Sequence, residues 1–103
     1  MKRIIKPWGY ELLIEQNDKY VVKELGMNKG HMCSLQYHKK KKETIYVLNG
    51  KLKVYLGETI DNLDEIIMKP HDTLTLNPLI IHRMEAVEDS VYLEASTPEL
   101  DDV

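Results

Sequence analysis

Two stretches carry the strongest structural signal in the chain: GHMCSLQYHKKKKE at residues 30–43 and DTLTLNPLIIH at residues 72–82. Successive side chains of a β-strand point to opposite faces. In an extended first stretch, one face would therefore carry Ser34, Gln36 and His38, and the other Cys33, Leu35 and Tyr37. A strand that is buried on both sides and lines a polar cavity explains this pattern better than a strand with one wet face. The interior of a small barrel offers such a place.

The rest of the chain also favours β-structure. Period-two alternation and short β-branched runs occur nearly everywhere, and no segment with helical spacing is longer than about 12 residues. We predict strands at residues 10–15, 20–25, 32–38, 44–48, 52–56, 65–68, 73–76, 82–87 and 91–95. Turn residues separate them at a spacing of roughly 8 to 12 residues, which is typical of a sandwich or a barrel. For Asn49-Gly50 we expect a type I′ turn that joins its flanking strands in a hairpin.

Length and composition narrow the class of protein. The chain has 103 residues and a formal net charge of −3, which favours a single domain over residues 1–103. The lone Cys33 argues against a disulfide framework or a multi-cysteine zinc site and is typical of a reducing cytosol. No apolar run approaches the roughly 20 residues that cross a bilayer. We therefore expect a cytoplasmic protein that binds neither membranes nor, given its slightly acidic balance, nucleic acid.

The two stretches resemble the two motifs of the cupin superfamily, in order and at the right separation. Three further segments narrow the resemblance: KPWGYE at residues 6–11, SLQYH at residues 34–38 and LEASTPELDDV at residues 93–103. They are similar to the cupin domain of type II mannose-6-phosphate isomerases, which is fused to nucleotidyltransferases, and to small free-standing relatives. The resemblance covers essentially the whole chain. It implies an all-β fold, the antiparallel double-stranded β-helix or jelly-roll barrel of the cupins.

The resemblance also implies a metal site. Cupin motifs supply three histidines and a glutamate for a divalent ion, and the matching positions here are His38, Lys40, Glu43 and His82. A lysine holds its proton to a pH of about 10.4, so Lys40 cannot act as an ordinary ligand. The remaining two imidazoles and one carboxylate suit Zn, Mn, Fe or Ni with open coordination positions. Alternatively, Lys40 points inward, pairs with Glu43 and takes the place of the metal.

For function, the resemblance implies aldose–ketose isomerisation of a sugar phosphate. This reaction needs a base for proton transfer and a group that stabilises the enediolate, which a divalent ion can do. We take Glu94 and Lys40 as candidates for proton transfer, and Gln36, Lys40 and Tyr10 as candidates for substrate binding. The lysine run at residues 39–42 is either a solvated turn or an attractant for anionic substrates.

A second class of function stays open, a non-catalytic cupin that binds a sugar or another small ligand because the metal site is weakened or lost at Lys40. Nothing in the sequence selects a third class, the iron dioxygenases. We expect a homodimer, since an N-terminal strand that carries Trp8 and Tyr10 is suited to extend a neighbour's sheet. We further expect His71 to be a turn residue and Cys33 to be buried and inert.

Overall fold

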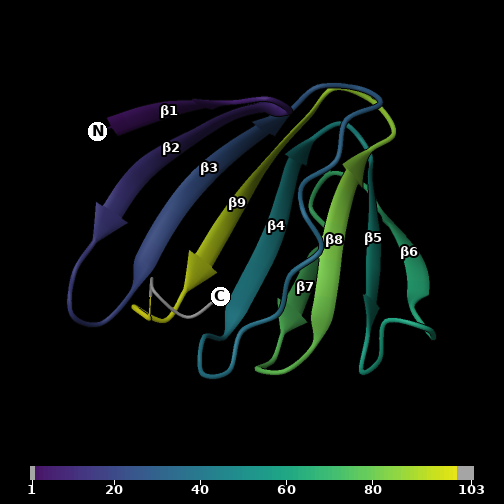
Figure 1. Ribbon diagram of the computed structural model, residues 1–103. Helices are drawn as coiled ribbons and strands as arrows, with labels where there is room; N and C mark the ends of the chain where they lie inside the picture. The colour runs from purple at the N-terminus through teal and green to yellow at the C-terminus, as the bar shows by residue number, and fades with distance from the viewer. Residues whose placement is uncertain (1, 100–103) are drawn as a thin grey trace.

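The computed structural model describes residues 2–99 and places two antiparallel sheets face to face (Figure 1). The larger sheet has the strand order β1-β2-β3-β9-β4-β7, and the smaller sheet has the order β6-β5-β8. Their bounds are β1 Lys2–Lys6, β2 Gly9–Gln16, β3 Val21–Met27, β4 Glu43–Asn49, β5 Leu52–Gly57, β6 Asp64–Met68, β7 Thr73–Leu76, β8 Ile81–Ala86 and β9 Ser90–Ser96. The all-β prediction is confirmed for the described residues. Among them, no helix is long and apolar enough to cross a membrane.

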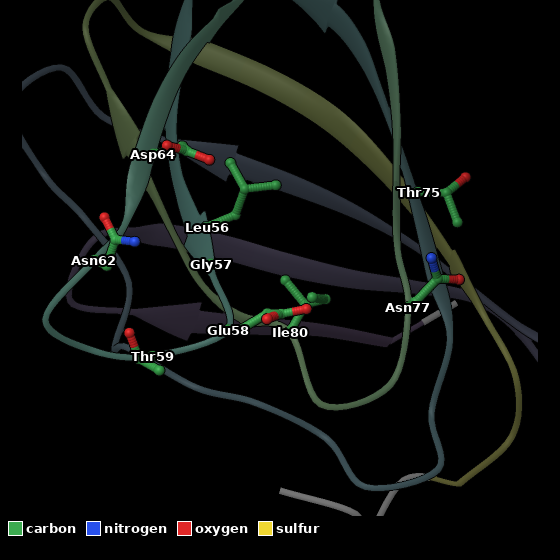
Figure 2. A pocket seen from close by; sticks show the side chains of 9 residues that line it. All are labelled: Leu56, Gly57, Glu58, Thr59, Asn62, Asp64, Thr75, Asn77 and Ile80. Carbon is green, nitrogen blue, oxygen red and sulfur yellow. The ribbon is translucent and has the colours of Figure 1, made fainter.

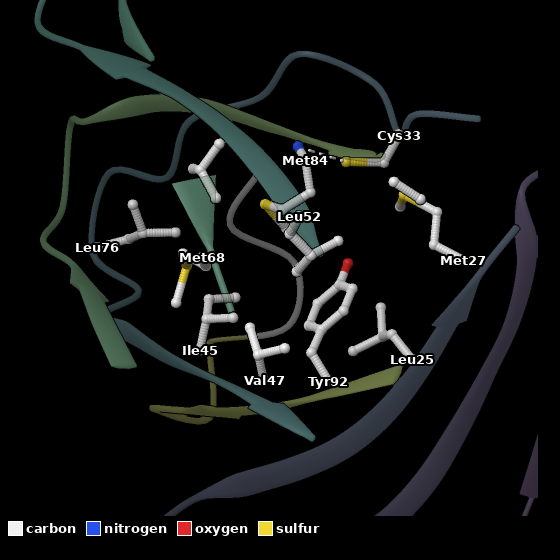
Figure 3. Packing of buried hydrophobic residues seen from close by; sticks show 12 residues of the cluster. Leu25, Met27, Cys33, Ile45, Val47, Leu52, Met68, Leu76, Met84 and Tyr92 are labelled. Atoms are coloured by element: carbon white, nitrogen blue, oxygen red, sulfur yellow. Dashed lines mark hydrogen bonds between the residues drawn. The ribbon is translucent and has the colours of Figure 1, made fainter. Parts of the chain in front are cut away.

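The core lies between the two sheets and follows from the alternation of the strands (Figure 3). In β4, Ile45 and Val47 are fully buried, and in β5, Leu52 and Val54 are fully buried. The residues between them are half-buried on the opposite face, as expected for strands with one face toward a core. Burying each of these aliphatic side chains contributes roughly 1.5–3 kcal/mol. Together they fix the register of the strands that carry the polar residues described below.

The predicted strand assignment needs correction at two places, one strand that is absent and one that was not predicted. Residues 32–38 do not form a strand, because their backbone pairs with β8 through two isolated bridges, Met32 to Glu85 and Gln36 to His82, and not through a continuous ladder. Further hydrogen bonds join Cys33 to Arg83 and Met84 of β8. The strand β1 at the N-terminus was not predicted. Its residues are almost all exposed, so no alternation of burial marks it in the sequence.

The hairpin expected at Asn49-Gly50 is also wrong. β4 pairs with β7 and β9, whereas β5 pairs with β6 and β8, so the turn carries the chain from one sheet to the other. Of the two turn residues Asn49 and Gly50, only Gly50 has a positive φ, at 89°. A type I′ turn requires a positive φ at both of its central residues. A Cβ at Gly50 would overlap sterically with Asp89 O, so this glycine is needed for close approach to the turn that precedes β9.

Candidate metal centre

A cavity of about 540 Å³ opens on the inner side of the larger sheet. Strands β2, β3, β4 and β9 supply part of its wall, and β8 with residues 33–38 supplies the opposite part. Its lining residues are Lys6, Trp8, Glu11, Lys23, Leu25, Cys33, Ser34, Gln36, His38, Lys41, Glu43, Met84, Tyr92 and Glu94. The cavity therefore combines an apolar floor with an unusual density of ionisable groups.

His38 and Glu43 line this cavity, and both lie close to His82, which is buried beside them and is not among the lining residues. One ligand atom from each lies within 4.8 Å of the others, and all three side chains are at least 96% buried. The two imidazole rings are 5.5 Å apart, centroid to centroid. His38 Nε2 is 2.7 Å from Glu43 Oε1, which is hydrogen-bond distance, and His82 Nε2 is 3.9 Å from the same oxygen. Two imidazoles and a carboxylate that converge in this way fit a divalent transition metal.

Hydrogen bonds to the backbone hold the ring of His82 and the main chain of His38 in place. His82 Nδ1 is 3.0 Å from the carbonyl oxygen of Ile80, and because a carbonyl can only accept, Nδ1 carries the proton. The lone pair of His82 Nε2 then faces Glu43 and His38, which is the arrangement of a metal-binding histidine held by an outer hydrogen bond. On the other side, Leu79 N donates to the carbonyl oxygen of His38 at 2.6 Å and anchors that loop. Burial lowers the pKa of His82, which keeps the ring neutral and able to bind a metal.

The lysine at this centre is Lys41 and not Lys40. Lys40 is exposed and is absent from the cavity wall, whereas Lys41 is only 8% exposed and its Nζ lies 3.8 Å from Glu43 Oε1. The contact with Glu43 was expected from Lys40, and the structure shows it for Lys41, one residue further along the chain. Four consecutive lysines give no sequence signal for which of them turns inward. The presence of Lys41 brings a positive charge next to the candidate ligands.

Glu94 lies in the cavity, as its proposed role in proton transfer requires. Burial of its carboxyl group, followed by the nearby charge of Glu43, raises the pKa of Glu94 to about 7. The two carboxyl groups also share a hydrogen bond, while Lys41 and Lys23 act in the opposite direction. Two acids this close cannot both ionise freely, so one of them keeps a proton near neutral pH.

Of the predicted substrate-binding residues Gln36 and Tyr10, only Gln36 lines the cavity. The backbone of Gln36 pairs with that of His82. Tyr10 does not line it, because its hydroxyl donates to Glu24 at 2.7 Å and the guanidinium of Arg3 stacks over its ring. The neighbouring Glu11 does line the cavity, so Tyr10 points to the opposite face of β2.

Sequence reasoning missed several charged and aromatic residues of this site. Glu11 bridges two lysines, with Oε1 at 2.7 Å from Lys23 Nζ and Oε2 at 3.7 Å from Lys6 Nζ. Trp8 lines the cavity from the turn between β1 and β2, whereas the sequence predicted it only as part of a strand that extends a neighbour's sheet. Tyr92 was not singled out at all. Its position two residues before Glu94 on the same strand was the available signal, because residues at this spacing share a face.

A second hollow, of about 500 Å³, lies near the turn that follows β5 (Figure 2). Its polar side chains are Glu58, Thr59, Asn62, Asp64, Thr75 and Asn77, all of them exposed. It is lined by no histidine, lysine or cysteine. This hollow therefore lacks the converging and buried donor groups that distinguish the first cavity.

Comparison with known proteins supports this description. The sequence profile of the family described as "Mannose-6-phosphate isomerase C-terminal" matches residues 1–91. The chain is 35% identical over 57 residues to mannose-1-phosphate guanylyltransferase 2 of Escherichia coli. That match covers 55% of this chain and 12% of the relative, so the chain spans only about an eighth of the relative's length.

Solved structures share the fold at low sequence identity. KdgF from Halomonas sp. superimposes with a TM-score of 0.84 at 16% identity, over 98% of this chain and 91% of that chain. An RmlC-like cupin from Shewanella frigidimarina superimposes with a TM-score of 0.80 at 14% identity, over 97% and 87% of the two chains. These likenesses confirm the predicted cupin fold. The profile match over residues 1–91 shows that the chain belongs to the family described as "Mannose-6-phosphate isomerase C-terminal".

Proposed function

We propose that the cavity binds a divalent metal ion and a small sugar phosphate, and that it catalyses aldose–ketose isomerisation of that sugar phosphate. The observation that carries this proposal is the convergence of His38, Glu43 and His82 beside a cavity whose wall includes His38, Glu43 and three lysines. These three residues would hold the ion. When bound, the ion supplies a Lewis acid for the carbonyl oxygen of the sugar.

The charges of the cavity favour an anionic ligand. The cavity wall carries equal numbers of formal positive and negative charges, from Lys6, Lys23 and Lys41 and from Glu11, Glu43 and Glu94. A divalent cation would add two positive charges to this balance, and protonation of Glu94 would add a further one. Since Lys6 and Lys23 share the single carboxylate of Glu11, one positive charge at the mouth remains uncompensated. A phosphate group matches this excess.

Glu94 is the residue best suited to move a proton. With its pKa raised to about 7, the carboxyl group accepts a proton and returns it with similar ease near neutral pH. Its hydrogen bond to Glu43 holds it beside the candidate ligands. In this assignment Glu94 transfers the proton between adjacent sugar carbons, while Lys41 stabilises negative charge at the same place. Lys40 remains on the outer surface.

A second candidate is a binding protein without catalytic activity. The position of Lys41 favours it, since the lysine ammonium places a cation 3.8 Å from Glu43 without any metal. In that case Lys41 and the two histidines would bind an anionic sugar directly. The two candidates differ in whether ligand binding depends on a metal.

The test is a coupled assay for conversion of mannose 6-phosphate to fructose 6-phosphate, after removal of metals and reconstitution with Mn(II) or Zn(II). We expect activity that requires the ion and that is lost in His38→Ala. The matched control is His31→Ala, because His31 is exposed and lies outside the cavity. Metal-independent binding of mannose 6-phosphate without turnover would support the second candidate and contradict the first.

A further inference from the structure

Tyr92 has a hydroxyl group whose environment the proposed proton transfer does not explain. The residue lies on β9, is fully buried, and its hydroxyl has no hydrogen-bond partner among residues 2–99. Figure 3 shows its ring beside Leu25 and Val47, with the oxygen directed toward the side of the core that holds Met84 and Cys33. Buried tyrosine hydroxyls usually have a partner, since burying an unpaired polar group costs free energy.

The surroundings of this hydroxyl place it at the floor of the cavity. Tyr92, Cys33 and Met84 all contribute to the cavity wall. Cys33 Sγ already accepts a hydrogen bond from Met84 N at 3.4 Å, so the thiol is engaged with the backbone. Burial, together with the charges of Glu94 and Glu43, raises the pKa of Tyr92 well above its usual value. The phenol therefore remains neutral and keeps a proton that it can donate.

We propose that Tyr92 is a ligand-contacting residue, whose hydroxyl donates a hydrogen bond to a sugar oxygen at the floor of the cavity. This inference rests on the proposed function, because it assumes that a sugar phosphate enters. It adds an orientation: the sugar hydroxyls lie inward, against Tyr92, and the phosphate lies outward. Lys6 and Lys23 are the partly exposed lysines of the wall, with 37% and 21% of their side chains accessible, and they fit the phosphate end.

The test is Tyr92→Phe, which removes one oxygen and leaves the ring that fills the core. Isothermal titration calorimetry with Mn(II) present would compare two probes, mannose 6-phosphate and inorganic phosphate. We expect Tyr92→Phe to weaken the binding of mannose 6-phosphate about tenfold and to leave inorganic phosphate unchanged, because only the sugar reaches the floor. The ligand-free variant should melt at the same temperature as the wild type or higher, because the hydroxyl it removes has no partner.

Tyr46→Phe is the matched control, because the Tyr46 hydroxyl bonds to His71 outside the cavity and its loss should leave ligand binding unchanged. Equal affinities of the wild type and Tyr92→Phe for mannose 6-phosphate would overturn the role of Tyr92 alone. A lower melting temperature of ligand-free Tyr92→Phe would also overturn it, since the hydroxyl would then have a partner within the protein. Failure of the wild type to bind mannose 6-phosphate would overturn the proposed function and this inference together.

Discussion

Replacing Glu94 by glutamine is expected to stabilise the metal-free protein at alkaline pH. The pKa of this carboxyl group is raised from 4.5 to about 7, so the folded state binds the proton more tightly than the unfolded state does. The stabilising contribution is therefore complete below about pH 4.5 and is lost as the pH rises through about 7. A tenfold change in proton affinity corresponds to about 1.4 kcal/mol, so the wild type should lose about 3 kcal/mol of unfolding free energy over this range.

Glutamine cannot ionise, but it keeps the shape of the side chain and can donate a hydrogen bond to Glu43. Urea unfolding in EDTA, followed by circular dichroism at about pH 4 and about pH 8, should show the stability of Glu94→Gln relative to the wild type rising by about 3 kcal/mol between the two pH values. Glu88→Gln is the control, because Glu88 is exposed. The same pH dependence in Glu94→Gln and the wild type would contradict the burial and coupling assigned to Glu94. With metal restored, this variant should lose isomerase activity by at least about 100-fold.

Three further predictions concern the surroundings of the site and the edge of the larger sheet. Lys41→Met should weaken mannose 6-phosphate binding about tenfold in calorimetry, whereas Lys40→Met should not; equal effects would contradict the placement of Lys41 in the cavity. Leu79 has a positive φ of 74° and a side chain that is 61% exposed, so Leu79→Gly should raise the unfolding free energy by about 0.5–1 kcal/mol in thermal melts; a lower melting temperature would contradict this. We propose a homodimer through the unpaired edge of β1, where Ile5 is 75% exposed, in place of the edge expected near Trp8 and Tyr10. Sedimentation equilibrium should then give twice the monomer mass, and Ile5→Lys should give monomers; a monomeric wild type at high concentration would contradict it.

Much of the fold could be predicted from local alternation, because strands with one buried face impose a period of two on the sequence. The predicted strands at residues 44–48 and 73–76 differ from the observed ones by at most one residue at either end. The Asn49-Gly50 hairpin failed for a non-local reason. Turn preference describes the bend, but it does not determine whether both strands continue in the same sheet. That choice depends on the contact between Gly50 and the Asp89 turn, about forty residues away in the chain.

The candidate ligands could be named from the sequence because they occupy fixed places in two recognisable motifs. Their convergence, with ligand atoms within 4.8 Å, could only be expected from the resemblance. For residues outside the two motifs, the sequence contained no pattern that identified them as part of the site. Lys41 is one of four identical neighbours, and Tyr92 resembles any other core aromatic until its unpartnered hydroxyl is seen. Tyr10 shows the opposite case, because its strand position directs it away from the cavity while Glu11 faces inward.

A metal titration of the purified protein, monitored by calorimetry and by mass spectrometric metal analysis, examines the site itself. After removal of metals, the wild type and His31→Ala should each take up close to one Mn(II) or Zn(II) per chain, because the three candidate ligands are present in both. His82→Ala should fold, as judged by circular dichroism, and bind no ion tightly. A wild type that takes up no metal, or a His82→Ala variant that binds as the wild type does, would contradict the metal centre proposed for His38, Glu43 and His82.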